Sequence, residues 1–280
     1  MLVKTYAGAV NGIEATTVTI EVNISPGVRF FLVGLADAAV KESQQRIESS
    51  LRTVGLHWPG KQVLVNMAPA DIRKEGSAFD LSLAVGILAA NEHIVRHDLD
   101  KFILMGELSL DGSLKPVKGI LPVALNAIAD GFTSMIVPIG NAPEAAVVQG
   151  LKVYGMNKLQ DVIDYFNGMK IFKPVEVDVD ELFRTTANIY DVDFADVKGQ
   201  HSVKRAFEVA AAVGHNVILV GPPGSGKTML ARRMPTIVPP LTLEEALETT
   251  MIHSVSGKLD NNTSLMTKRP FRSPHHTISE

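Results

Sequence analysis

The stretch that decides the fold of the C-terminal part is Asn216-Val-Ile-Leu-Val-Gly-Pro-Pro-Gly-Ser-Gly-Lys-Thr-Met-Leu-Ala-Arg-Arg-Met234. Residues 216–220 form a short apolar run, which is typical of a strand buried on both faces. Residues 221–228 match the pattern G-x4-G-K-S/T, and residues 229–234 continue as a helix. A strand, a glycine-rich loop and a helix in this order predict an α/β domain with an anion-binding loop.

The residue types of this loop suit a nucleoside triphosphate. Glycines allow successive backbone N–H groups to surround phosphate oxygens, and the following helix adds its positive N-terminal pole. We expect Lys227 to bridge the β- and γ-phosphates and the Thr228 hydroxyl to hold Mg²⁺, which makes both candidate catalytic residues. A chance match in a glycine-bearing turn is the alternative, and the flanking strand and helix disfavour it. The expected cofactors are ATP and Mg²⁺, bound by Gly221, Pro222, Pro223, Gly224, Ser225, Gly226, Lys227, Thr228 and Met229.

Composition limits the remaining possibilities. The 280 residues are 46% hydrophobic and 20% charged, which is ordinary for a folded chain of two domains. The absence of cysteine excludes disulfides, thiol catalysis and Cys-based zinc sites. The net charge of -3 means that any contact with nucleic acid must be local or assembled from several subunits. No signal peptide or membrane-length apolar run is visible, so we expect a cytoplasmic protein without membrane contact.

The N-terminal part reads as mixed α and β. Alternation over 18–24 predicts a half-buried strand, and Trp58 beside Pro59-Gly60 is expected to cap the core, since a base-stacking role would need an exposed ring. After residue 117, a helix, strand, helix, strand and helix are expected through Asn167. The other predicted elements are strands at 29–33 and 62–66, helices at 36–54 and 78–90, and a hairpin over 102–117 turning at Asp111-Gly112.

A change of pattern marks the domain boundary. Residues 172–180 carry a proline and dense acids, which indicates an extended linker. We therefore predict a first domain at 1–170, a linker at 171–193 and a second domain at 194–280. The fold class is α/β: an α+β N-terminal domain followed by part of a P-loop α/β domain.

Several motifs carry a family resemblance across the chain. The stretch 215–234 resembles the magnesium-chelatase I-subunit branch of AAA+ ATPases. Within that branch, the chain is similar to the bacterial ComM group, whose front domain true chelatase I-subunits lack. The stretches that carry this second likeness are 66–81, 106–112, 239–246, 252–257 and 269–277.

The resemblance implies a function for the whole protein. ComM-like proteins are implicated in DNA uptake and recombination as hexameric, ATP-driven branch-migration motors, so DNA and a homo-hexamer are the expected partners. In AAA+ proteins a segment before the first helix lies against the adenine, which would here place Val197, Gly199 and Gln200 near the base. A loop without ligand contact is the alternative for these three. A metal-insertion ATPase and a protease-associated unfoldase remain alternative functions.

The front domain also resembles the proteolytic domain of Lon, which has the ribosomal protein S5 domain 2-like fold. Lon-type proteolysis needs a serine nucleophile and a lysine amine. Matching residues 76–80 to Lon's G-P-S-A-G run places Ala78 at the nucleophile position, and matching 119–121 places a leucine at or beside the lysine position. A shift by one residue would use Ser77, with Lys115 or Lys118 nearby in sequence. We expect a domain without peptidase activity.

Two further features concern the end of the chain. This family uses an apolar strand ending in Asp-Glu for hydrolysis, and none occurs between Thr228 and Glu280. We therefore expect a truncated chain that binds ATP without hydrolysing it. The basic run Lys268, Arg269 and Arg272, with His275-His276, either contacts DNA phosphates or is a partly solvated loop of the ATPase core.

Overall fold

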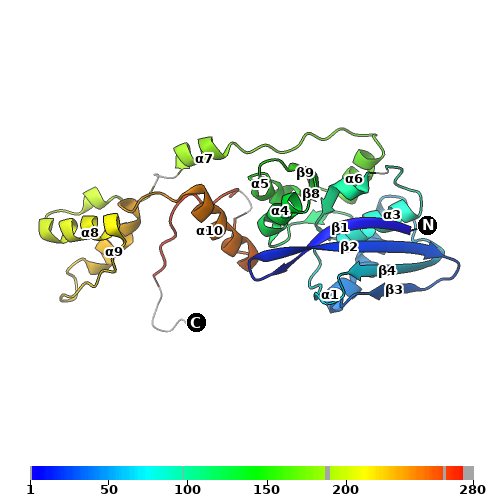
Figure 1. Cartoon of the computed structure of the whole chain (residues 1–280), viewed down its shortest axis with the longest axis horizontal. Helices are drawn as coiled ribbons and strands as arrows, with labels where there is room; N and C mark the ends of the chain where they lie inside the picture. Colours follow the sequence, from blue (N-terminus) through cyan, green and yellow to red (C-terminus); the bar gives the residue numbers. More distant parts are fainter. Residues whose placement is uncertain (1, 97, 187–189, 261–262, 274–280) are drawn as a thin grey trace. The chain divides into compact units, whose positions relative to one another are not determined.

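The computed structural model describes residues 2–96, 98–186, 190–260 and 263–273 (Figure 1). The chain divides into two compact units, each of which is described by itself. The first unit comprises residues 1–177 and 249–265, and the second comprises 178–248 and 266–280.

The first unit is built on a seven-stranded mixed sheet in the order β3-β4-β2-β1-β5-β8-β9. The pair β1–β2 and the pair β2–β4 are antiparallel, whereas β3–β4, β1–β5, β5–β8 and β8–β9 are parallel. A two-stranded ribbon, β6–β7, stands apart from it. The strands are β1 (Leu2–Asn11), β2 (Glu14–Ser25), β3 (Phe30–Val33), β4 (Gln62–Ala68), β5 (Phe102–Leu104), β6 (Glu107–Leu108), β7 (Leu114–Lys115), β8 (Ser134–Pro138) and β9 (Lys152–Met156).

Helices cover both faces of this sheet. Helix α3 is buried along its whole length, and Thr5 on β1 donates to the carbonyl of Ser82 on α3 at 3.0 Å. Helix α4 meets the other face, because a Cβ on Gly8 would lie 2.5 Å from a methyl of Val123. The helices of this unit are α1 (Ala38–Lys41), α2 (Ser43–Thr53), α3 (Asp80–Ala90), η1 (Leu99–Lys101), α4 (Ile120–Ala129), η2 (Ile139–Asn141), α5 (Ala142–Ala145) and α6 (Leu159–Phe166).

One part of the α4-side face carries exposed apolar side chains. Register places Phe31, Leu64, Asn23 and Leu2 in one row across β3, β4, β2 and β1. The side chains of Phe31, Leu64 and Leu2 remain 42%, 37% and 60% exposed. This row, which includes the first residue of β1 and lies near the end of β2, therefore presents three exposed apolar side chains to solvent.

The expected elements of the first unit are largely present. The alternation over 18–24 predicts β2 correctly, since Val18, Ile20 and Val22 are buried. The predicted helix over 36–54 is divided into α1 and α2 at Glu42. The hairpin predicted over 102–117 was too long: residues 102–104 join the main sheet as β5, and only β6 and β7 pair around the turn at residues 109–112.

The second unit is helical in the part of the chain that the structure describes. A small apolar core of Phe194, Val197, Phe207 and Leu230 joins its segments. Residues 243–248 of α10 (Leu243–Ser256) belong to this unit and residues 249–256 to the first. Its other helices are α7 (Val179–Thr186), η3 (Phe194–Asp196), α8 (His201–Val213), α9 (Lys227–Arg233) and η4 (Met234–Thr236).

Two local predictions for this region were wrong. Residues 216–220 do not form a strand, and Ile218 and Val220 are 87% and 89% exposed. A strand requires a hydrogen-bonded neighbour, and none of the described residues of this unit supplies one. The sequence predicts an acidic, extended segment up to residue 180, whereas helix α7 begins within it, at Val179. The Asp178 carboxylate accepts from the amide of Glu181 at the start of this helix.

No helix among the described residues is long and apolar enough to cross a membrane.

Candidate nucleotide site

The glycine-rich loop lies directly before α9. Gly224 and Gly226 adopt left-handed backbone conformations with φ of 78° and 83°. Gly226 is the N-cap of α9, and its carbonyl accepts from the amide of Leu230 at 2.9 Å. This backbone conformation favours glycine at both positions, because residues with a Cβ rarely adopt it.

The Lys227 amine folds back over this loop. Its Nζ donates to the carbonyls of Gly221 at 2.9 Å and Pro222 at 2.8 Å, and lies 3.4 Å from the Ser225 hydroxyl. A lysine that already spans the loop is in position to exchange these oxygens for phosphate oxygens. The loop chemistry therefore fits an anionic phosphate tail.

Thr228 and Met229 occupy the first turn of α9, and both are exposed. The Thr228 hydroxyl is a hard oxygen ligand of the kind that Mg²⁺ prefers. A Cβ built on Gly226 would lie 3.6 Å from the terminal methyl of Met229. Met229 thus borders the loop on its helix side.

The segment at 193–200, which contains the residues expected near the adenine base (Val197, Gly199 and Gln200), is hydrogen-bonded to the helix that follows the loop. The guanidinium of Arg233 donates to the Asp193 carbonyl at 3.0 Å and lies 3.4 Å from the Asp196 carboxylate. The amide of Phe194 donates to the Thr236 hydroxyl at 3.2 Å. The backbone amide of Asp193, helped by Arg233, lowers the pKa of Asp196. These contacts fix the segment against α9 and η4.

The three residues predicted to lie near the adenine base differ in their surroundings. The side chain of Val197 is buried in the core beside Phe194. Gly199 and Gln200 both have positive φ, and the Gln200 side-chain amide lies 3.5 Å from the carbonyl of Ser225. The structure thus brings Gln200 to the glycine-rich loop, whereas the Val197 side chain is packed inside the unit.

Sequence reasoning missed Arg233 and Asp193. Their only sequence signals are a second arginine near the end of a helix and an aspartate before a short turn. Both patterns are common, because arginine is favoured near helix C-termini and aspartate near helix N-termini. Only the folded chain shows that these two residues meet.

The basic run is partly engaged within the second unit. The Arg269 guanidinium donates to the Pro239 carbonyl at 2.8 Å and pairs with the Glu245 carboxylate at 3.0 Å. The Lys268 amine lies 5.9 Å from the Tyr190 ring centre, and Arg272 is exposed. His275 and His276 lie outside the described residues.

The Lon-like segment does not join a serine to a lysine among the described residues. The Ser77 hydroxyl instead donates to the Glu107 carboxylate. Nearby, the buried Asp80 accepts from Arg46 at 2.6 and 2.9 Å and from the Leu108 amide at 3.1 Å. Burial raises the pKa of Asp80, and the hydrogen bonds from Arg46 oppose that effect. The geometry here is that of a structural ion pair.

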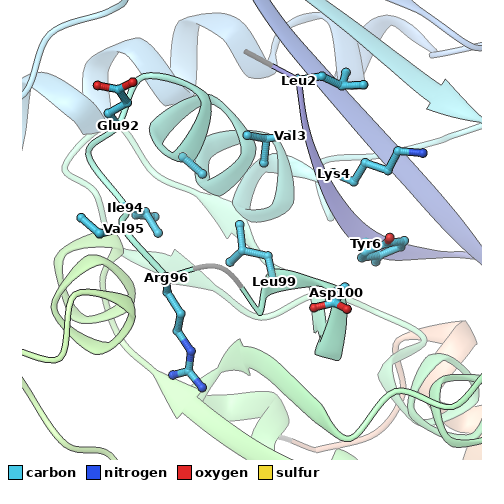
Figure 2. Close-up of a pocket in the computed structure, with 11 residues that line it drawn as sticks. Leu2, Val3, Lys4, Tyr6, Glu92, Ile94, Val95, Arg96, Leu99 and Asp100 are labelled. Carbon is cyan, nitrogen blue, oxygen red and sulfur yellow. The ribbon is translucent and has the colours of Figure 1, made fainter.

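A separate cavity of about 630 Å³ lies in the first unit between the start of β1 and the loop after α3 (Figure 2). Val3 and Leu99 contribute to its apolar lining, while the guanidinium of Arg96 points away from Val3 (Figure 2). Arg96 is paired with Asp98 and lies 5.1 Å from the centre of the Phe102 ring. Lys4 also lines the cavity and pairs with Glu21. The lining cations Arg96 and Lys4 therefore both have acidic partners.

Comparisons with known proteins identify the family. The family model described as "Subunit ChlI of Mg-chelatase" matches residues 20–141, and the model "Magnesium chelatase, subunit ChlI" matches residues 193–280. Competence protein ComM of Haemophilus influenzae is 40% identical over 98% of this chain and 54% of its own length. An uncharacterised protein of Mycobacterium tuberculosis strain H37Rv is 40% identical over 99% of this chain and 54% of its length.

The Lon-like resemblance is partial. Lon protease 2 of Bacillus subtilis is 28% identical over 126 residues, which is 44% of this chain and 22% of that protein. The chain therefore belongs to the magnesium-chelatase subunit ChlI family and is a ComM-like member of it. It spans about half the length of the curated relatives that it matches.

Proposed function

We propose that residues 221–228 bind ATP with Mg²⁺, and that the whole protein is an AAA+ ATPase whose turnover drives DNA remodelling, such as branch migration. The observation that carries the nucleotide site is the loop itself. Two left-handed glycines shape it, and the Lys227 amine lies within hydrogen-bond distance of its oxygens. This combination of backbone and cation is selective for a phosphate chain.

Each part of the loop has a proposed role. When bound, ATP supplies a phosphoanhydride bond and Mg²⁺ neutralises the charge on its phosphates. The amides of residues 224–227 would hold phosphate oxygens, and the Lys227 amine would leave its carbonyl partners to neutralise the β- and γ-phosphates. The Thr228 hydroxyl is the proposed ligand to Mg²⁺. Gln200 and Gly199, with the backbone of Val197, border the base.

The domain organisation supports a role beyond nucleotide binding. We propose a front domain at 1–170, a linker at 171–193 and an ATPase domain beginning at residue 194. The sequence similarity to ComM, which is named as a competence protein, extends over 98% of this chain and therefore includes the front domain. DNA as the partner, Lys268, Arg269 and Arg272 as possible DNA contacts, and a homo-hexamer are therefore parts of the proposal.

A metal-insertion ATPase is the second candidate, because both family models carry the magnesium-chelatase description. One experiment separates the two functions: ATP turnover of the whole protein is measured alone, with single-stranded DNA, with branched DNA, and with a porphyrin-chelatase subunit. We expect stimulation by DNA. Stimulation by the chelatase subunit, with no response to DNA, would reject DNA remodelling in favour of metal insertion.

A further inference from the structure

The cavity of about 630 Å³ in the first unit has the size and lining of a small-molecule site (Figure 2). Such sites usually have volumes of about 300–1,000 Å³ and a mostly apolar lining. All of its lining residues belong to the first unit, so it contains no residue of the proposed nucleotide site. We call it the β1 pocket, and its apolar lining consists of Leu2, Val3, Ala89, Ile94, Val95 and Leu99.

The wall of the β1 pocket that follows helix α3 is held in place from outside the cavity. The side-chain oxygen of Asn167 accepts from the Val95 amide at 3.1 Å, and its side-chain nitrogen donates to the His93 carbonyl at 2.9 Å. The guanidinium of Arg96 pairs with the Asp98 carboxylate. The pocket is therefore formed without a ligand, as small-molecule sites usually are.

The uncompensated charge of the pocket is negative. Glu92 and Asp100 line it, are exposed, and form no ion pair with any residue that the structure describes. Both lining cations, by contrast, have acidic partners outside the lining, so two cations stand against four carboxylates. The exposed Lys101, next to Asp100 in sequence, is not part of the lining and leaves the balance negative. A cleft with an excess of one sign of charge attracts the opposite sign.

An aromatic ring adds a second feature that suits a cation. Tyr6 lines the pocket from β1 and is half-buried. Its ring lies 5.1 Å from the ring of Phe132, which supports it. The face of a tyrosine ring attracts an organic cation.

We propose that the β1 pocket binds an amphiphilic amine, which is a small molecule with an aliphatic chain and an ammonium group. The chain lies against the apolar lining, and the negative charge of Glu92 and Asp100 attracts the ammonium group. An amphiphilic carboxylate has the same chain but is repelled by these two residues. The proposal does not rest on nucleotide binding or on DNA remodelling.

The test is calorimetric titration of the 280-residue chain with octylamine, octanol and octanoate, which share one chain length and differ in charge. At neutral pH the amine is protonated and the carboxylate is ionised. We expect octylamine to bind about 2- to 30-fold more tightly than octanol, and octanoate to bind most weakly. From hexylamine to decylamine, affinity should rise about 2- to 4-fold with each methylene group.

The charge variant has a matched control. Glu92→Gln with Asp100→Asn should remove the preference for octylamine and leave the affinity for octanol unchanged. Glu14→Gln with Glu176→Gln removes the same charge from exposed positions of the first unit outside the pocket lining, and should retain the preference.

A second variant tests the location of the aliphatic chain. Val3→Phe places a ring in the space that the chain would occupy and should weaken binding of all three ligands by at least about 10-fold. Val28→Phe adds the same ring at a position that is 88% exposed, and should bind as wild type does. Circular dichroism and thermal melting verify that every variant is folded.

Several results would overturn the proposal. They are no binding of the amines, equal affinity of wild type for octylamine and octanol, a retained amine preference in Glu92→Gln with Asp100→Asn, and undiminished binding by folded Val3→Phe. A fifth is binding of an alternating leucine–lysine peptide that depends on Glu92 and Asp100 while no amine binds. That result would assign the pocket to a protein segment and reject the small molecule.

Discussion

Replacing Gly226 by alanine tests whether the left-handed backbone of the loop is needed for nucleotide binding. Gly226 has a φ of 83°. A Cβ there has space, because its nearest neighbours are the Met229 methyl at 3.6 Å and the Gln200 amide at 3.7 Å. Any effect of Gly226→Ala therefore comes from backbone conformation rather than from a collision.

The expected magnitude follows from the strain of this conformation. Holding an alanine in the left-handed region costs about 1–2 kcal/mol. The free loop is largely exposed, so it can relax, and the strain is then felt when the nucleotide imposes the bound shape. We expect ATP affinity to fall about 5- to 30-fold in Gly226→Ala. Gly226→Asn should lose less, because asparagine tolerates this region better.

Isothermal titration calorimetry with a non-hydrolysable ATP analogue and Mg²⁺ is the assay. Gly60→Ala is the control, because Gly60 has an ordinary φ and open space around its Cβ position. Equal affinities of Gly226→Ala and wild type would refute the reasoning. So would an asparagine variant that binds more weakly than the alanine variant.

Three further predictions concern stability and pH. Arg46→Met leaves the buried Asp80 carboxylate without its ion-pair partner and should reduce the free energy of unfolding by about 3–5 kcal/mol at pH 7.5, measured by urea denaturation. Burial raises the pKa of Asp80 in the folded state, so the folded state loses stability as pH rises through that pKa and the carboxyl group ionises. The loss of unfolding free energy in Arg46→Met should therefore be smaller at pH 5 than at pH 7.5. An equal loss at both pH values would contradict the ion-pair explanation. Gly86→Ala places a Cβ 2.8 Å from a Val22 methyl and should destabilise the first unit by about 1–3 kcal/mol, whereas an unchanged melting curve would show that the sheet can shift away.

The sequence predicted those elements whose pattern is local. Strand β2 follows from strict alternation at 18–24, and α3 follows from a continuous apolar run at 81–90. The left-handed conformations of Gly224 and Gly226 and the helix that begins at Lys227 follow from the glycine and lysine spacing, because that motif contains its own backbone requirement; phosphate binding by the loop stays a prediction. Ordering of the strands in the mixed sheet depends on contacts distant in sequence, which periodicity does not encode.

The errors have physical causes of the same kind. Residues 216–220 have the composition of a buried strand, but pairing depends on neighbours that composition cannot supply. The acidic residues before residue 181 predict an extended linker, whereas acids in the first turn of a helix stabilise it, and α7 therefore begins at Val179. Arg233 and Asp193 are 40 residues apart, so their contact becomes visible only in the structure.

The most direct test of the central claim is calorimetric titration of the wild-type chain and Lys227→Ala with a non-hydrolysable ATP analogue, Mg²⁺ and, separately, adenosine. Lys258→Ala, an exposed lysine of the first unit, is the matched control. We predict that the analogue binds wild type and the control alike, that Lys227→Ala loses about 10- to 150-fold in affinity, and that adenosine binding is insensitive to the substitution. An analogue affinity that is the same with and without the Lys227 amine would contradict capture of the phosphate chain by this loop.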